Sequence, residues 1–223
     1  MSGSYTTASR QSSADFESLV APVLLRRMPG QIIPVEGRVD PALVALDRYC
    51  GIDYLHVNAK NEVKGIGTRV QSCSSSFDTF TIRHERASGV RTEFGKRKSD
   101  IRQHGLFPVF TLQAFVSKRQ DLHAPPELLA FAIARTSDLM DLIDQGLSSL
   151  EMTGPNQIGQ AKFHVIGWSK VVASGVQVVI YDKDKGLSAY PVSNAETGLP
   201  EDIEPEVTEA EATAYAMSGR LYR

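Results

Sequence analysis

Long apolar runs are missing from this sequence, and cysteine and tryptophan are scarce. No apolar stretch approaches the roughly 18 residues of a membrane-spanning helix, and residues 1–17 lack the apolar centre of a secretory signal. The two cysteines, Cys50 and Cys73, form neither a metal-type spacing nor a disulfide framework. We therefore expect a soluble protein with no membrane partner, in a reducing, cytoplasmic setting.

Signatures of several common enzyme classes are absent as well. The pair Gly65 and Gly67 lacks the third glycine of a dinucleotide fingerprint, and no Gly-x-Ser-x-Gly elbow occurs. The five histidines are scattered, and residues 182–186 begin like a calcium loop but lack its later acidic ligand. The sequence thus gives little support to dinucleotide binding, serine hydrolysis or a dedicated calcium loop.

The sequence has an ordinary globular composition, but its charge is unevenly placed. The 223 residues are 42% hydrophobic and 22% charged, which suits one domain with a buried core. Residues 191–223 hold seven acids against two arginines, whereas residues 15–190 hold 21 basic and 19 acidic side chains. We predict a disordered N-terminal arm at 1–14, a single globular domain at 15–190 and an acidic, flexible tail at 191–223.

Hydrophobic periodicity and turn residues predict the order of helices and strands. We expect helices at 15–28, 98–104 and 127–145, and strands at 50–57, 63–71, 77–84, 90–94 and 107–116. Residues 41–46 fit either a short helix or the lead-in to a strand. A late hairpin is expected from 163–173 and 176–181, turning at Ser174-Gly175.

This order predicts an α/β or α+β fold. We expect a central mixed β-sheet flanked by helices, with a C-terminal β-hairpin. The hairpin belongs either to the core or to the interface of a homodimer, and the sequence leaves both open.

Asp53 is the most informative residue, because it lies within an apolar strand. A buried carboxylate is costly unless it is paired, hydrogen-bonded or metal-bound. Arg69 and Gln71 lie two apart on the returning strand and therefore share one face. A turn that leaves five residues unpaired places Asp53 on that face, opposite Gly65, with Asp47 opposite Gln71. A turn that leaves four points Asp53 away, and the sequence leaves both registers open.

An acidic residue on one strand, followed by a returning strand that ends in a polar-x-polar pair, resembles the core of the PD-(D/E)xK nuclease superfamily. The resemblance covers residues 17–115, with a helix before the hairpin and a strand and a helix after it. It implies a restriction-endonuclease-like core in which Asp53 is the first carboxylate that binds Mg²⁺. Gln71 then stands in the place of the family's lysine and orients the attacking water.

Arg69 departs from the family pattern, because it stands where the second carboxylate should be. An arginine repels a divalent cation instead of binding it. A second metal ligand must then come from another acid, and the candidates are Asp47, Glu93 and Glu17. Alternatively the site has no metal chemistry, and Asp53 and Arg69 form an ion pair across adjacent strands that contributes ~0.2–1 kcal/mol.

A basic run follows this hairpin and suits contacts to phosphate. Residues 83–102 contain seven cations against three acids, a net charge of +4. The run also fits an ordinary solvated surface. The side chains that we expect to contact a phosphodiester backbone are Arg83, Arg91, Lys96, Arg97, Lys98 and Arg102.

These observations predict a nucleic-acid-acting protein whose partner is DNA or RNA. Its leading form is a Mg²⁺-dependent nuclease, a hydrolase in which Asp53 binds the metal, Gln71 orients water and Arg69 stabilises the charge on the phosphate. The alternative is a protein without catalysis: a nucleic-acid binder that lost the metal site, or an interaction and assembly protein whose acidic tail docks a partner. Arg69 is the residue that favours the alternative.

Overall fold

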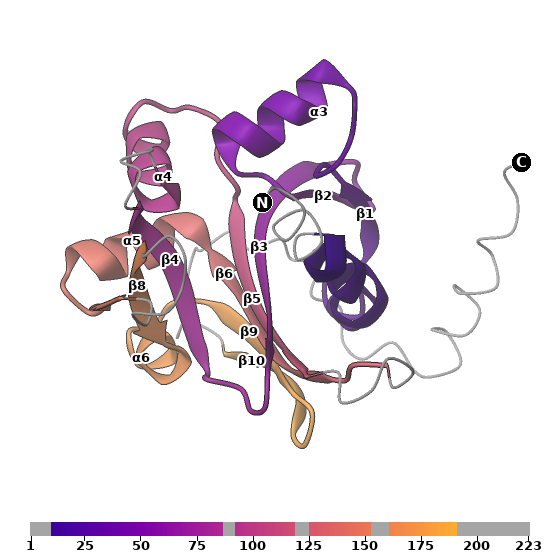
Figure 1. Cartoon of the computed structure of the whole chain (residues 1–223), viewed down its shortest axis with the longest axis vertical. Helices are drawn as coiled ribbons and strands as arrows, with labels where there is room; N and C mark the ends of the chain where they lie inside the picture. Colours follow the sequence, from indigo (N-terminus) through magenta and orange to yellow (C-terminus); the bar gives the residue numbers. More distant parts are fainter. Residues whose placement is uncertain (1–9, 87–91, 119–124, 153–160, 191–223) are drawn as a thin grey trace, which may run out of the picture.

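Two β-sheets organise the chain (Figure 1). The computed structural model describes residues 10–86, 92–118, 125–152 and 161–190, which form a seven-stranded and a three-stranded sheet flanked by helices. The predicted mixed sheet with flanking helices is therefore confirmed, as an α+β fold. In spatial order, the large sheet contains β1 (Gly30–Pro34), β2 (Tyr54–Asn58), β3 (Val63–Cys73), β5 (Phe110–Ser117), β6 (Leu128–Arg135), β9 (Val178–Asp182) and β10 (Gly186–Tyr190). The small sheet contains β4 (Thr79–Arg86), β8 (Ala161–Gly167) and β7 (Ser149–Met152).

A parallel pair divides the large sheet. β1, β2 and β3 run antiparallel to one another, β3 pairs in parallel with β5, and the pairings from β5 to β10 are antiparallel. A parallel pair requires a crossover connection. Here the crossover contains β4 and the helix α4 (Glu93–Arg102). It therefore carries one strand of the second sheet and one helix out of the plane of the first.

The N-terminal helix packs on one face of the large sheet. Residues 10–15 are helical and continue through the π-helical turn η1 (Phe16–Val20) into α2 (Ala21–Leu24). Pro22 explains the irregular turn, because its nitrogen cannot donate a helical hydrogen bond. The ring of Phe16 stacks on Tyr54, with the ring centroids 4.2 Å apart. The predicted helix is present, and it begins inside the segment 1–14 that we had assigned to the arm.

The hydrophobic core has two parts, one on each face of the large sheet. Phe16, Leu24, Ile66 and Phe131 belong to the part beneath the N-terminal helix. The other part lies between the two sheets and includes α5 (Thr136–Asp144) and α6 (Trp168–Ala173). The remaining helices are α3 (Pro41–Ala45) and the π-helical turn η2 (Leu46–Cys50).

The helix predicted at 127–145 is wrong in its first half, where β6 occupies Leu128–Arg135. Residues 128–134 contain no polar side chain, so a helix there would expose apolar groups on every side. A central strand that is covered on both faces buries all of them, and residues 130–134 are at most 3% exposed. The second half is helical as α5, and Gly146, with φ of 76°, follows its end.

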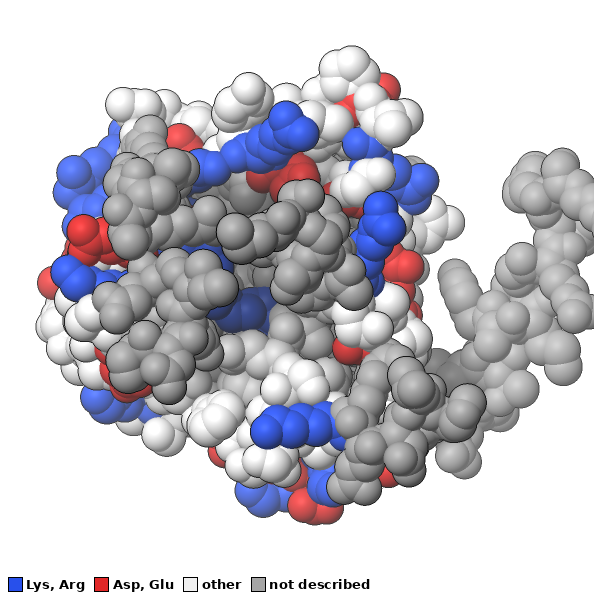
Figure 2. Space-filling model, in the orientation of Figure 1, with Lys and Arg blue, Asp and Glu red and all other residues white. Residues whose placement is uncertain are grey.

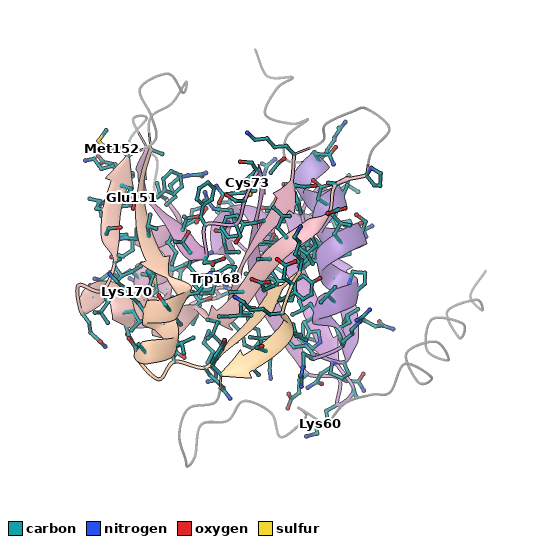
Figure 3. The ribbon with its side chains drawn as sticks, turned by 90° about the horizontal axis from the view of Figure 1, so that it is seen from below. Lys60, Cys73, Glu151, Met152, Trp168 and Lys170 are labelled. Carbon is teal, nitrogen blue, oxygen red and sulfur yellow. The ribbon has the colours of Figure 1, made fainter. Side chains whose placement is uncertain are left out.

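The strands predicted at 163–173 and 176–181 are present in part as β8 and β9, but they lie in different sheets and do not form a hairpin. Ser174-Gly175 does not join two strands, because Gly175 (φ 73°) follows the C-terminus of α6. The C-terminal hairpin is instead β9 and β10, joined by the turn before Gly186. Trp168 opens α6 and packs against the rings of Phe80 and Phe115. It lies toward the middle of the molecule, whereas Lys170 on the same helix lies at its periphery (Figure 3).

Two other predicted strands differ from the structure. The strand expected at 50–57 begins only at Tyr54, since residues 46–50 are helical and Gly51 takes a left-handed conformation after them. Of the strand expected at 90–94, residues 90 and 91 lie outside the described residues, and Glu93 and Phe94 begin α4. The alternative at 41–46 resolves as the helix α3. β1, β7 and β10 had not been predicted.

The predicted tail at 191–223 and residues 1–9 of the arm lie outside the described residues. No helix in the described ranges is long and apolar enough to cross a membrane.

Replacing Phe131 tests the assignment of β6 as a central strand. Phe131 is fully buried and stacks on Tyr181, so we expect Phe131→Ala to lower the free energy of unfolding by about 3–5 kcal/mol. The control is Phe77→Ala, the same truncation at a side chain that is 64% exposed, for which we expect less than about 1 kcal/mol. Urea unfolding measures both. Equal losses in the two variants would contradict the placement of Phe131.

Candidate functional site

The β2–β3 hairpin adopts a register that places the predicted residues on one face. Val57 pairs with Val63, and residues 59–62 connect the end of β2 to the start of β3. Asp53 directly precedes β2, and its N–H donates to the carbonyl of Ile66. Alternation from this register assigns Asp53, Arg69 and Gln71 to one face. Leu55, not Asp53, lies opposite Gly65, and Asp47 lies in η2 and not opposite Gln71.

Asp53 is a half-buried carboxylate with neutral hydrogen-bond donors. Its Oδ2 atom accepts hydrogen bonds from the N–H of Thr68 at 2.5 Å and from the Thr68 hydroxyl at 3.1 Å. Burial raises the pKa of Asp53 to about 7; the Thr68 N–H opposes this shift, and the charges of Glu36 and Glu93 add to it. Asp53 therefore changes protonation near neutral pH.

Arg69 pairs with Glu93 and not with Asp53. The Arg69 Nη2 atom lies 2.9 Å from Glu93 Oε1, and the N–H of Arg83 donates to Glu93 Oε2 at 3.3 Å. Burial alone would raise the pKa of Glu93, but Arg69, Arg97 and Arg83 outweigh it and lower that pKa to about 2. The ion pair that we considered across β2 and β3 is thus replaced by one between β3 and α4.

Arg97 completes a group that we call the arginine cluster: Arg69, Arg83 and Arg97 around the Glu93 carboxylate. Arg97 is only 6% exposed, and its Nη1 atom has no hydrogen-bond partner. A β-carbon on Gly67 would come within 2.9 Å of Arg97 Nη2, so the missing side chain makes room for the guanidinium. Burial lowers the pKa of Arg97, with Glu93 acting in the opposite direction.

Neutral polar groups of β3, β4 and β5 are bonded to one another near the cluster. Gln113 of β5, 1% exposed, donates from Nε2 to Gln71 Oε1 at 2.9 Å and accepts from the Thr81 hydroxyl at 2.8 Å. The guanidinium groups of Arg69 and Arg83 both lie over the Phe163 ring, 4.9 and 5.6 Å from its centroid. Gln71 is therefore held by the protein, and the arginines are held against an aromatic ring.

The basic run divides into two groups. Arg83 and Arg97 belong to the arginine cluster, whereas the ammonium of Lys96 donates to the carbonyl of Arg48 and that of Lys98 pairs with Asp144 at 2.5 Å. Arg102 is exposed at the end of α4, and Arg91 lies outside the described residues. Figure 2 shows blue lysine or arginine atoms set back from the surface near the centre of this face, in the region where Figure 1 places β3 and β4. The run thus supplies both a partly buried group and a surface group of cations.

The acids near Asp53 do not form a Mg²⁺ site in this arrangement. Among the described residues, no three His, Cys, Asp or Glu side chains gather closely enough to hold a metal ion. Glu93 is bonded to Arg69, and Glu17 is exposed on the helix that packs on the opposite face of the sheet. Asp47 lies on η2, where burial and then Glu36 raise its pKa. Mg²⁺ requires several oxygen ligands in near-octahedral geometry, which these acids do not supply together.

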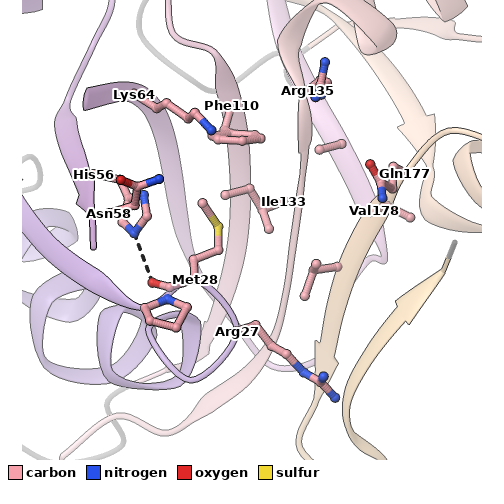
Figure 4. Close-up of a pocket in the computed structure, with 13 residues that line it drawn as sticks. Arg27, Met28, His56, Asn58, Lys64, Phe110, Ile133, Arg135, Gln177 and Val178 are labelled. Atoms are coloured by element: carbon pink, nitrogen blue, oxygen red, sulfur yellow. Dashed lines mark hydrogen bonds between the residues drawn. The ribbon is translucent and has the colours of Figure 1, made fainter. Parts of the chain in front are cut away.

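A separate cavity of about 70 Å³ lies on the other side of the large sheet, where Met28, Phe110 and Ile133 line it (Figure 4). His56 also lines it and bonds through Nε2 to the carbonyl of Met28 at 3.0 Å, while its Nδ1 atom has no partner. None of the predicted site residues lines this cavity. It is therefore distinct from the arginine cluster.

Sequence reasoning named Arg69, Glu93 and Arg97 but did not bring them together, and it missed Gln113, Thr81 and Phe163. Comparisons with protein-family models, with curated proteins and with solved structures find no match to this chain. The function must therefore be argued from the geometry of the site.

The raised pKa of Asp53 predicts a pH-dependent stability. Between its ordinary value of 3.8 and about 7, folded Asp53 keeps a proton that the unfolded chain has lost. Stability is therefore lost as pH rises through this window, by at most about 1.4 kcal/mol per pH unit. Asp53→Asn removes this titration while keeping an oxygen for Thr68. We therefore expect the free energy of unfolding of the variant, relative to that of the wild type, to rise from about pH 5 to about pH 8. Urea unfolding at both values measures this, and a constant difference would contradict it.

Proposed function

We propose that this protein acts on nucleic acid, and that a phosphate group of the DNA or RNA backbone binds at the arginine cluster. The observation that carries the proposal is the convergence of Arg69, Arg83 and Arg97, from β3, β4 and α4, on the single carboxylate of Glu93. Three guanidinium groups around one carboxylate leave an excess of positive charge and of N–H donors. Guanidinium groups suit phosphate because they present several donors in a fixed plane.

The order of elements around the site supports a nuclease-like core. The N-terminal helix is followed by β1, by the β2–β3 hairpin with Asp53 at its start, and then by α4 and β5, which lies parallel to β3. The strand β4 lies between the hairpin and α4, so the chain follows the order of helix, hairpin, strand and helix that the resemblance to PD-(D/E)xK nucleases implies. The free thiols of Cys50 and Cys73 agree with a cytoplasmic setting.

Phosphodiester cleavage is the first candidate activity. The resemblance assigns Asp53 to a metal, and Asp53 does lie beside the arginine cluster. Its raised pKa favours the protonated carboxyl group, and a bound cation would favour the carboxylate. Mg²⁺, when bound, would neutralise phosphate charge and activate water. The side-chain oxygens near Asp53 do not complete a set of Mg²⁺ ligands in this arrangement. The contribution of the chain's own residues is therefore to hold the phosphate through Arg69 and Arg97.

Binding without cleavage is the second candidate, and the Arg69–Glu93 ion pair favours it. An acid that is bonded to an arginine cannot also act as the second metal ligand while that bond persists. The arginines would then bind nucleic acid through their charge, and the affinity would not depend on divalent metal ions.

A cleavage assay with Asp53→Asn separates the two candidates. For the nuclease, we expect Mg²⁺- or Mn²⁺-dependent cleavage of mixed DNA and RNA substrates that EDTA stops and Asp53→Asn abolishes, with the fold unchanged by circular dichroism. The matched control is Asp184→Asn, at an aspartate in the β9–β10 turn, which should cleave like the wild type. Cleavage that survives in Asp53→Asn would remove Asp53 from the mechanism.

Salt-dependent binding tests the arginine cluster whether or not cleavage occurs. We expect Arg69→Gln to weaken binding of a labelled oligonucleotide and to reduce the slope of log K against log salt concentration by about one. The control is Lys170→Gln, which removes the same charge from the periphery on α6 (Figure 3). Fluorescence anisotropy at several salt concentrations measures both. The proposal is wrong if Lys170→Gln lowers the affinity as much as Arg69→Gln does.

A further inference from the structure

The Glu93 carboxylate is bound by the kind of donors that hold a phosphate group. One of its oxygens accepts from the guanidinium of Arg69, and the other accepts from the main-chain N–H of Arg83. Guanidinium and main-chain N–H groups are the donors that proteins commonly use for phosphate oxygens. Glu93 therefore occupies a set of donors that an incoming phosphate could use.

The cluster offers more donors than a carboxylate can satisfy. Arg97 is buried against Gly67, yet its Nη1 atom has no acceptor. A buried N–H group without an acceptor is costly, and native proteins rarely leave one. A backbone phosphodiester presents two non-bridging oxygens in a tetrahedral arrangement, wider than the planar carboxylate of Glu93, so it could bond Arg69 and Arg97 together.

Glu93 also has a route out of the cluster. Its side chain is 31% exposed, whereas that of Arg69 is 20% exposed and Arg97 is 6% exposed as a residue. It is the first residue of α4, so rotation of its side chain does not require the helix to move. The acid can leave while the arginines stay in place.

We propose that Glu93 is an exchangeable internal anion: its carboxylate holds the place of a nucleic-acid phosphate at the arginine cluster and swings out when that phosphate binds. This inference rests on the proposed function and adds how the site is regulated. Glu93 offsets part of the positive charge of the arginine cluster in the free protein and competes with the ligand. If Glu93 were instead a metal ligand or a purely structural acid, removing its charge would weaken the binding of nucleic acid.

The competition predicts that removing the charge of Glu93 strengthens binding. We expect Glu93→Gln to bind a labelled single-stranded oligonucleotide about five- to tenfold more tightly than the wild type, in EDTA and at fixed salt. Glu93→Asp keeps the charge on a shorter side chain and should bind with intermediate affinity. The control is Glu151→Gln, an exposed acid on the edge strand β7 (Figure 3), which should leave the affinity unchanged.

Inorganic phosphate provides a second readout that needs no oligonucleotide. Without an anion, Glu93→Gln should melt below the wild type, because Arg69 and Arg97 lose their counter-charge. Added phosphate should raise the melting temperature of Glu93→Gln much more than that of the wild type, because the vacated donors bind it. Sodium chloride at the same ionic strength is the control, and equal shifts in the two proteins would overturn the inference.

The outcomes separate this inference from the proposed function. If Glu93→Gln and Arg69→Gln both weaken oligonucleotide binding, Glu93 supports the arginines and the inference is wrong, while nucleic-acid binding at the cluster stands. If neither variant changes the affinity, the phosphate binds elsewhere and both ideas fail. If Glu93→Gln does not fold, Glu93→Asp decides, and an affinity equal to or below the wild type would reject the exchange.

Discussion

The ion pair between Arg69 and Glu93 is the interaction around which the candidate site is arranged. It joins β3 of the large sheet to α4, and Glu93 also accepts the N–H of Arg83 in the small sheet. One carboxylate thus links the three elements β3, β4 and α4. Guanidinium groups can be buried there only because this carboxylate and the Phe163 ring accompany them. An apolar residue in place of Glu93 would leave three cations facing one another.

The same neighbourhood shifts two carboxylates in opposite directions. Both Asp53 and Glu93 are withdrawn from water, which by itself favours the protonated acid. Glu93 has arginines beside it and stays charged at any ordinary pH. Asp53 has the neutral donors of Thr68 and two like charges nearby, and so it keeps its proton up to about pH 7. The position of positive charge, and not burial, therefore decides which acid is ionised.

Much of the fold could be predicted from local patterns, because hairpin turns and strand alternation are encoded by neighbouring residues. The pairing of β2 with β3 and the strand β4 follow from such patterns. β6 could not be distinguished from a helix, since an unbroken apolar run fits both and only the two covered faces of the sheet decide. The Arg69–Glu93 pair was likewise beyond reach, because it depends on how the crossover folds back over β3. Asp53 and Arg69 were found as residues, but their partners are long-range.

The crossover between β3 and β5 has a consequence for the order of folding. It delivers β4, whose partner β8 lies far along the chain, so Phe80 meets Ile166 only after β5 and β6 have been added. Contacts of such sequence separation form slowly, because a long loop must close before they stabilise anything. During synthesis the N-terminal helix, β1, β2 and β3 can assemble early from local contacts. The surroundings of Glu93 cannot be completed until β8, with Phe163, has been made, so the site is among the last parts of the molecule to acquire its native form.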